Sequence, residues 1–177
     1  VFEKRERLGG MLRYGIPSYR LPRERLQEDI DCILSTGVKI NTGVEIGRDI
    51  TIPKLKEDFD CIYIAIGAHT DKKIGIVGED KRGVISAVEM LRGIGDNSLP
   101  DFTRKRVVVV GGGNVAMDCT RSAKRLGAES VTCVYRRRRT DMTALEDEIS
   151  GAESEGCEIL CLQAPVKISG DEDENVT

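Results

Sequence analysis

A run of four valines followed directly by three glycines limits what this chain can fold into. Val107–Val110 contains only β-branched residues, which favours a strand buried on both faces of a sheet. Gly111–Gly113 comes next, and apolar residues then recur at helical spacing between Val115 and Leu126. This order of strand, glycine turn and helix is typical of the first half of a βαβ unit that binds a nucleotide.

The glycine run has the G-x-G-x-x-A form of the dinucleotide-binding motif. Gly111 lets the chain turn sharply, Gly113 lets the backbone approach a pyrophosphate, and Ala116 lets helix and strand pack closely. Backbone N–H groups at the start of the helix would then hold the phosphates. Small residues also recur in ordinary tight turns, so the flanking strand and helix are what favour a dinucleotide site over a structural corner.

The next strand indicates which dinucleotide binds. Ser130–Tyr135 is apolar, and Arg136–Arg139 follows where an NAD site would place an acid for the ribose 2′-hydroxyl. A guanidinium suits a 2′-phosphate, because its planar fork forms paired, charge-assisted hydrogen bonds with phosphate oxygens. Four basic residues in a row are more often a solvated surface run, but their position at a strand end predicts NADP(H) as the cofactor.

Composition argues against several classes of protein. The net charge is −3 and aromatic residues make up 4% of the chain, so we expect no nucleic-acid partner. No apolar run reaches the ~18 residues that a membrane span needs, so we expect no membrane partner. Val1–Arg7 does not resemble a signal peptide. These features predict a cytoplasmic protein.

Cysteine and histidine usage predicts neither a metal centre nor a catalytic side chain. The single histidine, His69, follows an apolar segment in a loop, where a solvated residue is expected. The six cysteines form no C-x-x-C pair and lie in apolar segments, so we expect buried free thiols in a reducing compartment. These cysteines are Cys32, Cys61, Cys119, Cys133, Cys157 and Cys161.

Strands and helices alternate along the rest of the chain, which predicts an α/β fold with a parallel sheet. Val1–Glu3 resembles the end of a strand with a terminal acid, and residues 70–104 read as a connector. A hairpin turn is expected over Gly170–Thr177. We expect further strands at Val38–Ile46, Cys61–Gly67, Cys157–Leu162 and Val166–Ile168, and helices from Pro22, from Pro53, near Ala87–Leu91 and over Ala144–Glu155 with Leu145 inward.

Several ordered motifs together resemble one family, over essentially the whole chain. The chain is similar to the small (beta) subunits of NADPH-dependent glutamate synthase. Related proteins are the NADPH-to-flavin half of dihydropyrimidine dehydrogenase and the flavoprotein subunit of electron-bifurcating ferredoxin–NADP reductase. The motifs that carry the resemblance are Glu3–Gly10, Arg13–Pro17, Arg20–Pro22, Ala65–Ala68, Gly111–Asp118 and Tyr135–Arg137.

The resemblance implies Rossmann-like parts of an FAD domain that is interrupted by an inserted NADPH domain. Residues 1–98 would be a partial FAD-binding domain with a connector, and residues 99–177 the first part of the NADP(H)-binding domain. No residue would be catalytic and none would bind a metal. The resemblance places Glu3 at the FAD ribose, Gly10, Met11 and Arg20 along FAD, and Ile46 near the adenine. It places Gly112, Gly113, Asn114 and Val115 at the NADPH pyrophosphate, and Arg136 and Arg137 at its 2′-phosphate. Gly111, which makes the sharp turn of the glycine motif, is counted with the cofactor-binding residues.

The activity that the resemblance implies is hydride transfer from NADPH to FAD. Electrons would then pass to iron–sulfur centres of the large glutamate synthase subunit or of another acceptor, and the chain could form a homo-oligomer. The family's first FAD strand with its glycine loop, its iron–sulfur cysteines and its closing FAD segment have no counterpart here. Ile66 stands where relatives often have threonine. We therefore expect a fragment that is inactive alone and retains FAD weakly or not at all.

Other functions remain open at this point. The chain could be the NADP-binding part of a different oxidoreductase, of the ferredoxin–NADP reductase kind. A flavin-free NADP-dependent dehydrogenase should carry a Tyr-x-x-x-Lys pair or a histidine proton donor after the nucleotide fold, and neither is present in the sequence. A nucleotide-sensing binding module is a third possibility, and such a module should be complete at both ends.

Overall fold

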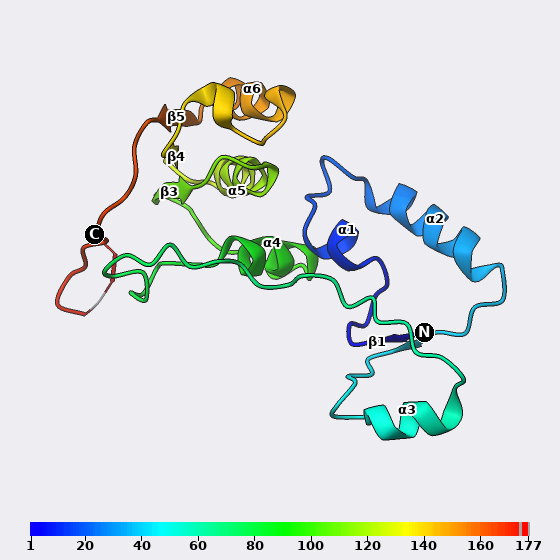
Figure 1. Ribbon diagram of the computed structural model, residues 1–177. Helices are drawn as coiled ribbons and strands as arrows, with labels where there is room; N and C mark the ends of the chain where they lie inside the picture. The colour runs from blue at the N-terminus through cyan, green and yellow to red at the C-terminus, as the bar shows by residue number, and fades with distance from the viewer. Residues whose placement is uncertain (174, 177) are drawn as a thin grey trace. The chain divides into compact units, whose positions relative to one another are not determined.

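Parallel sheets organise both units into which the chain divides (Figure 1). The computed structural model describes residues 1–173, 175 and 176. The first unit is Val1–Ala68, and the second begins at His69. The mixed α/β class with parallel strands, predicted from the alternation of strands and helices, is confirmed. The predicted domain boundary at residue 98 concerns which cofactor each part binds, and it stays a prediction.

The first unit combines a short sheet with helices. β1 (Phe2–Glu3) pairs in parallel with β2 (Asn41–Thr42), which confirms that Val1–Glu3 is the end of a strand. The helix expected from Pro22 is also present, and it packs through Leu26 and Ile30. The helices of this unit are α1 (Gly10–Tyr14), α2 (Arg23–Leu34) and α3 (Ile52–Asp58).

The strands predicted in the first unit are shorter than expected or absent. The strand over Val38–Ile46 is reduced to the two residues of β2. The buried strand predicted over Cys61–Gly67 is wrong, since this segment is irregular and Tyr63 within it is 90% exposed. No strand pairs with the segment among the described residues, and an extended chain needs hydrogen-bonded neighbours to be stable in water. Apolar composition alone therefore misled the prediction.

The second unit contains a parallel sheet in the order β3–β4–β5. Each strand is joined to the next by a helix, as the βαβ pattern predicts. α4 packs against α5, and a single turn of 3₁₀ helix, η1 (Arg139–Asp141), follows β4. The elements are α4 (Ala87–Gly95), β3 (Arg106–Val110), α5 (Asn114–Arg125), β4 (Ser130–Tyr135), α6 (Glu146–Ser154) and β5 (Glu158–Cys161).

The main core lies where α5 and α6 cover one face of this sheet and α4 packs against α5. Met117, Cys133 and Ile149 are completely or almost completely buried there. The prediction that the valine strand is buried on both faces is wrong, because Val108 on its other face is 65% exposed. Alternate residues of a strand point to opposite faces of its sheet, and the connecting helices cover the face that holds Val107 and Val109.

The end of the chain departs from the predicted pattern in two places. Leu145 was expected to face inward, but it precedes α6 and is exposed. Val166–Ile168 is not a strand, since only Lys167 forms an isolated parallel bridge, to Val77. An antiparallel bridge between Gly170 and Val176 supports the predicted hairpin turn. Residues 174 and 177 of that turn lie outside the described residues.

The cysteines differ in burial, although all six are free. Cys119, Cys133 and Cys157 are buried, as predicted. Cys32 and Cys61 are exposed, so the prediction is wrong for these two. Cys32 lies on the outer side of α2, and Cys61 lies in the unpaired segment after α3, so neither reaches a core. Over the described residues, no helix is long and apolar enough to cross a membrane.

Candidate functional site

The glycine turn, Gly111–Gly113, joins β3 to α5 and depends on small residues. Gly111 has φ +150°, and its N–H donates to the Val134 carbonyl oxygen at 3.0 Å. A Cβ added to Gly111 would lie 3.2 Å from the Cβ of Ala116, so a larger residue at either position would crowd the turn. The turn therefore brings the end of β3 next to the end of β4.

Backbone donors without a backbone acceptor lie where the glycine turn enters α5. Gly113 precedes the first turn of this helix in an extended conformation. Among the described residues, none accepts a backbone hydrogen bond from the N–H groups of Gly113, Asn114 or Val115. The first N–H groups of any helix have no acceptor inside the helix, and they carry its partial positive charge. Such a group of donors suits a phosphate.

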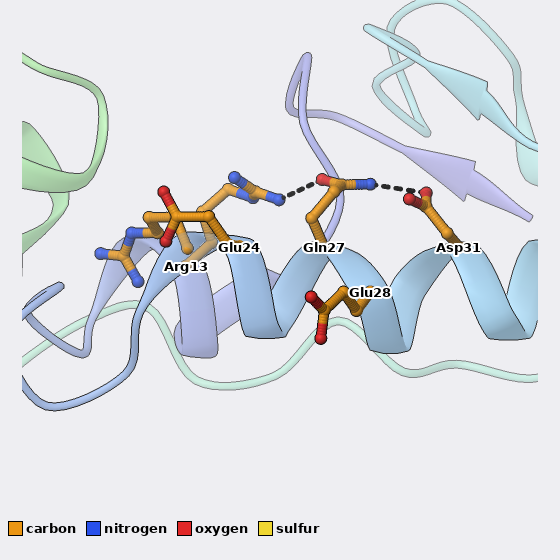
Figure 2. A pocket seen from close by; sticks show the side chains of 6 residues that line it. Arg13, Glu24, Gln27, Glu28 and Asp31 are labelled. Carbon is orange, nitrogen blue, oxygen red and sulfur yellow. Dashed lines mark hydrogen bonds between the residues drawn. The ribbon is translucent and has the colours of Figure 1, made fainter.

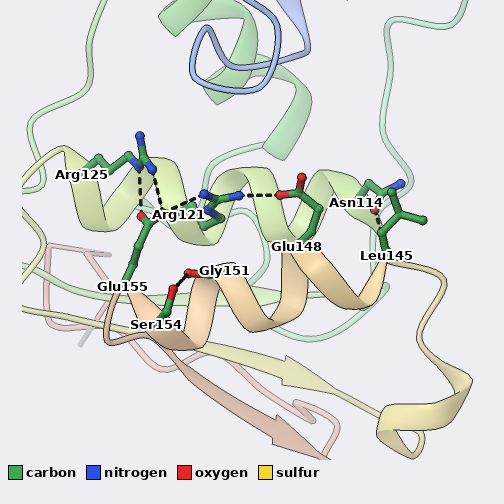
Figure 3. A network of polar contacts seen from close by, with 8 residues as sticks. All are labelled: Asn114, Arg121, Arg125, Leu145, Glu148, Gly151, Ser154 and Glu155. Atoms are coloured by element: carbon green, nitrogen blue, oxygen red, sulfur yellow. Dashed lines mark hydrogen bonds and ion pairs between the residues drawn. The ribbon is translucent and has the colours of Figure 1, made fainter.

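The side chain of Asn114 is already engaged in the structure. Its Oδ1 accepts a hydrogen bond from the Leu145 N–H at 3.0 Å, which ties the start of α6 to the start of α5 (Figure 3). The role predicted for Asn114 at the pyrophosphate can therefore rest on its backbone N–H, while its side chain holds the neighbouring helix. Val115 is exposed beside it.

The four arginines after β4 fall into two pairs. Arg138 forms an ion pair with Asp141 at 3.1 Å, and Arg139 forms ion pairs with carboxylates of α6. The hydrogen bond from Arg138 lowers the pKa of Asp141. Arg136 and Arg137 are exposed, and their guanidinium groups form no hydrogen bond or ion pair with the described residues. Half of the run is thus structural, and half is open to an anion.

Tyr135 connects the glycine turn to the arginine turn, which we define as Arg136–Asp141. Its hydroxyl donates to the Asp141 carbonyl oxygen at 2.7 Å. Its ring lies against buried Gly112, whose carbonyl oxygen accepts hydrogen bonds from the N–H groups of Thr143 and Ala144. Sequence reasoning did not assign this residue a role, although an aromatic residue at the last position of a strand, between two predicted phosphate-binding motifs, was a usable signal.

The residues predicted to contact FAD lie in the first unit. Glu3 ends β1; its Oε1 accepts a hydrogen bond from the Arg5 N–H, and its carbonyl oxygen accepts one from the Val44 N–H. Gly10 begins α1 with φ +49°, and Arg20 lies in the turn that follows Pro17. These contacts place Glu3 next to the segment that leads to Ile46. The remaining predicted residues, Met11 and Ile46, are exposed.

A shallow pocket in the same unit is a poor phosphate site. Arg13 donates to Gln27, which donates to Asp31, and Figure 2 shows these bonds along α2. Arg23 donates instead to backbone carbonyls, so both arginines have structural partners. Carboxylates would repel an anion there. The pocket is lined by Arg13, Arg23, Glu24, Gln27, Glu28 and Asp31.

Comparisons with known proteins agree with this geometry. The chain is 46% identical over 158 residues to the NADP(+)-dependent formate dehydrogenase subunit beta of Moorella thermoacetica, covering 88% of this chain and 22% of that protein. It is 34% identical over 178 residues to the glutamate synthase (NADPH) small chain of Escherichia coli (strain K12), covering 95% of this chain and 38% of that protein. The chain thus spans less than half the length of these curated relatives.

A solved structure shares the fold. FprA from Mycobacterium tuberculosis in complex with NADPH matches with a TM-score of 0.81 at 18% identity, over 99% of this chain and 58% of that chain. The family model described as pyridine nucleotide-disulphide oxidoreductase matches residues 6–177. The glycine turn, the parallel sheets and this match over nearly the whole sequence lead to one conclusion: the chain belongs to the pyridine nucleotide-disulphide oxidoreductase family.

Proposed function

We propose that this chain binds NADPH at the glycine turn and forms part of a flavin-dependent NADPH oxidoreductase. One observation carries the proposal: unpaired backbone N–H groups at the start of α5 lie beside a turn that presents two uncommitted arginines, Arg136 and Arg137. The N–H groups fit a pyrophosphate, because they offer several aligned donors and a partial positive charge. The guanidinium groups fit a 2′-phosphate.

The strand register supports the same assignment. Val110 of β3 pairs with Val134 of β4, so the glycine turn and the arginine turn leave the sheet side by side. A dinucleotide that binds across the carboxyl ends of two such strands meets the first turn with its pyrophosphate and the second with its adenosine ribose. In NADPH that ribose carries the extra phosphate, so Arg136 and Arg137 would distinguish it from NADH.

We propose that the first unit contributes to an FAD site through Glu3, Gly10, Met11, Arg20 and Ile46. Support comes from Glu3, since it ends a parallel strand, where a carboxylate can accept hydrogen bonds from ribose hydroxyls. Bound together, the two cofactors would supply the chemistry of hydride transfer from NADPH to FAD, with an iron–sulfur centre as the proposed electron acceptor. The residues of this chain would bind and orient the two cofactors, and no acid–base side chain is required.

The names of the relatives support a protein that works with a partner subunit. The E. coli protein is called a small chain and the Moorella protein a subunit beta. We propose the glutamate synthase small-subunit type, in which the partner is the large subunit. A formate dehydrogenase type is the second candidate, because identity to the Moorella subunit is higher, at 46% against 34%.

Calorimetric titration of the chain with NADPH and with NADH tests the nucleotide site. Arg136 and Arg137 together should give NADPH a preference on the order of a hundredfold or more, since each charge-assisted phosphate contact contributes about 1.5–3 kcal/mol. Equal affinities for the two nucleotides would contradict the proposal.

Alanine variants locate the preference within the arginine turn. Arg137→Ala should weaken NADPH by about tenfold or more and leave NADH nearly unchanged, because only NADPH has the 2′-phosphate. Arg25→Ala is the matched control, since Arg25 is an exposed arginine on α2 whose side chain pairs only with Glu28 in the described structure. A loss of NADPH affinity in the control as large as in Arg137→Ala would point to net charge and against a local contact.

A further inference from the structure

Gly112 is the middle residue of the glycine turn, and its missing side chain has a specific structural reason. A Cβ added there would lie 2.5 Å from Cδ2 and Cε2 of Tyr135 and 2.9 Å from Cγ. Real Cβ atoms essentially never come that close to another heavy atom. Gly112 does not have a positive φ, so conformational freedom does not explain the glycine. The close approach of the Tyr135 ring explains why this position is a glycine.

The Tyr135 ring is held at both ends, so it cannot simply swing away from Gly112. Its backbone lies in β4, opposite Cys161 of β5, and its carbonyl oxygen accepts a hydrogen bond from the Gln163 N–H. Its hydroxyl donates to the Asp141 carbonyl oxygen at 2.7 Å. The Asp141 carboxylate in turn accepts hydrogen bonds from the backbone N–H and the guanidinium of Arg138.

Arg136 and Arg137 lie between these two anchors. Tyr135 precedes them in the sheet, and the Arg138–Asp141 turn that its hydroxyl holds follows them. The segment after the arginine turn returns to the glycine turn as well, because the Gly112 carbonyl oxygen accepts the N–H groups of Thr143 and Ala144 at 2.9 and 3.1 Å. The backbone that carries the two free arginines is therefore fixed relative to the donors of α5.

We infer that Tyr135 is a positioning residue for nucleotide selectivity: it sets the arginine turn against the glycine turn, so that the 2′-phosphate and the pyrophosphate of one NADPH are bound together. This inference rests on the proposed NADPH site. Preorganised groups bind more tightly, because less conformational entropy is lost on binding. The selectivity that Arg136 and Arg137 provide should therefore depend on the Tyr135 hydroxyl, which donates to the Asp141 carbonyl oxygen and not to a ligand-binding group.

Tyr135→Phe tests the hydroxyl alone, because the ring that packs on Gly112 is kept. We expect the affinity for NADPH to fall about fivefold, which corresponds to one lost hydrogen bond, while the affinity for NADH changes less than about twofold. Tyr63→Phe is the matched control, since it removes the same hydroxyl from a side chain that is 90% exposed in the first unit. The Tyr63→Phe variant should prefer NADPH over NADH by the same factor as the unaltered chain.

A double-mutant cycle tests the contact between the ring and Gly112. Gly112→Ala should weaken both nucleotides by about tenfold in the unaltered chain, because the added methyl group displaces the ring and disturbs the turn. In a Tyr135→Ala background, Gly112→Ala should lower the affinity for each nucleotide by less than about threefold. Equal losses in the two backgrounds would overturn the assigned contact. Urea unfolding of each variant shows whether the chain remains folded.

The outcomes separate this inference from the proposed function. If the unaltered chain fails to prefer NADPH, the proposed nucleotide site itself fails. If the chain prefers NADPH and Tyr135→Phe keeps the whole preference, only the inference about Tyr135 is overturned. If Tyr135→Phe weakens NADPH and NADH equally, the hydroxyl supports the fold in general, and its role in selectivity is refuted.

Discussion

The four neighbouring arginines Arg136–Arg139 differ in their contacts because their surroundings differ. Arg138 and Arg139 bind carboxylates of the turn and of α6, so they fix the backbone. Arg136 and Arg137 are exposed, and under the proposed function their donors would bind the 2′-phosphate of NADPH. Arginine suits both tasks, since its guanidinium forks onto carboxylates and phosphates alike. Substitution of the first pair should mainly lower stability, and substitution of the second should mainly lower NADPH affinity.

Alkylation should separate the cysteines according to burial. Desolvation raises the pKa of Cys119 to about 12 and that of Cys133 to about 11. Because the thiolate is the reactive form, these two should remain unlabelled in the folded chain at neutral pH. Iodoacetamide should modify exposed Cys32 and Cys61 first, and peptide mass spectrometry measures the order. Fast labelling of Cys119 or Cys133 under native conditions would contradict the assigned core.

Helices α5 and α6 are held together by a partly buried ion-pair network (Figure 3). Arg121 of α5 pairs with Glu148 at 2.6 Å and with Glu155 at 2.8 Å, and its side chain is only 15% exposed. Arg125 also pairs with Glu155. Together with the contact between Asn114 and Leu145, this network fixes α6 along α5 and thereby fixes the segment that follows the arginine turn.

Removal of Arg121 should destabilise this helix pair. Arg121→Ala removes the cation that pairs with both Glu148 and Glu155. It should lower the free energy of unfolding by about 2 kcal/mol, between the values typical of exposed and of buried pairs. Lys54→Ala is the comparison, because Lys54 forms its ion pairs on α3 while 57% exposed. Lys54→Ala should lower the free energy of unfolding by less than about 1 kcal/mol. Urea unfolding measures both, and equal costs would contradict the role of burial.

Acid should weaken the same network. The hydrogen bonds from Arg125 and then Arg121 lower the pKa of Glu155 below its ordinary value of 4.5. The folded state therefore gains stability from the ionised carboxylate above that value and loses it as pH falls through the lowered pKa. The free energy of unfolding should decrease as the pH falls below about 4.5, and Glu155→Gln should show a smaller decrease. If the stability of Glu155→Gln depended on pH in the same way, Glu155 would not be a source of the loss of stability in acid.

Periodicity predicted elements well where one helix follows one strand. β3, α5, β4, α6 and β5 lie close to the predicted positions, because the glycine turn and the alternation of apolar segments are local signals. Cys61–Gly67 shows the limit of such signals: its composition suits a buried strand, yet pairing depends on a neighbour that its own residues do not encode. The exposure of Val108 has the same origin, since burial depends on what packs against a face.

The candidate site shows a similar division at the level of the whole chain. Motif spacing predicted the glycine turn and the arginine run, and the family assignment followed from motifs spread along the sequence. The separation of the run into two pairs was not predictable, because it depends on where α6 places Glu146 and Glu153. The contact between Tyr135 and Gly112 likewise arises only when β3 and β4 lie side by side.

Amide chemical shifts of the isotope-labelled chain, recorded during titration with NADP⁺, test the central claim most directly. The measurement reports which residues meet the nucleotide, independently of any enzymatic activity. The account predicts that the largest shifts fall on Gly113, Asn114, Val115, Arg136 and Arg137, and that NAD⁺ at the same concentration shifts the two arginines far less. Shifts confined to residues 1–68, or equal shifts of Arg136 and Arg137 with both nucleotides, would contradict it.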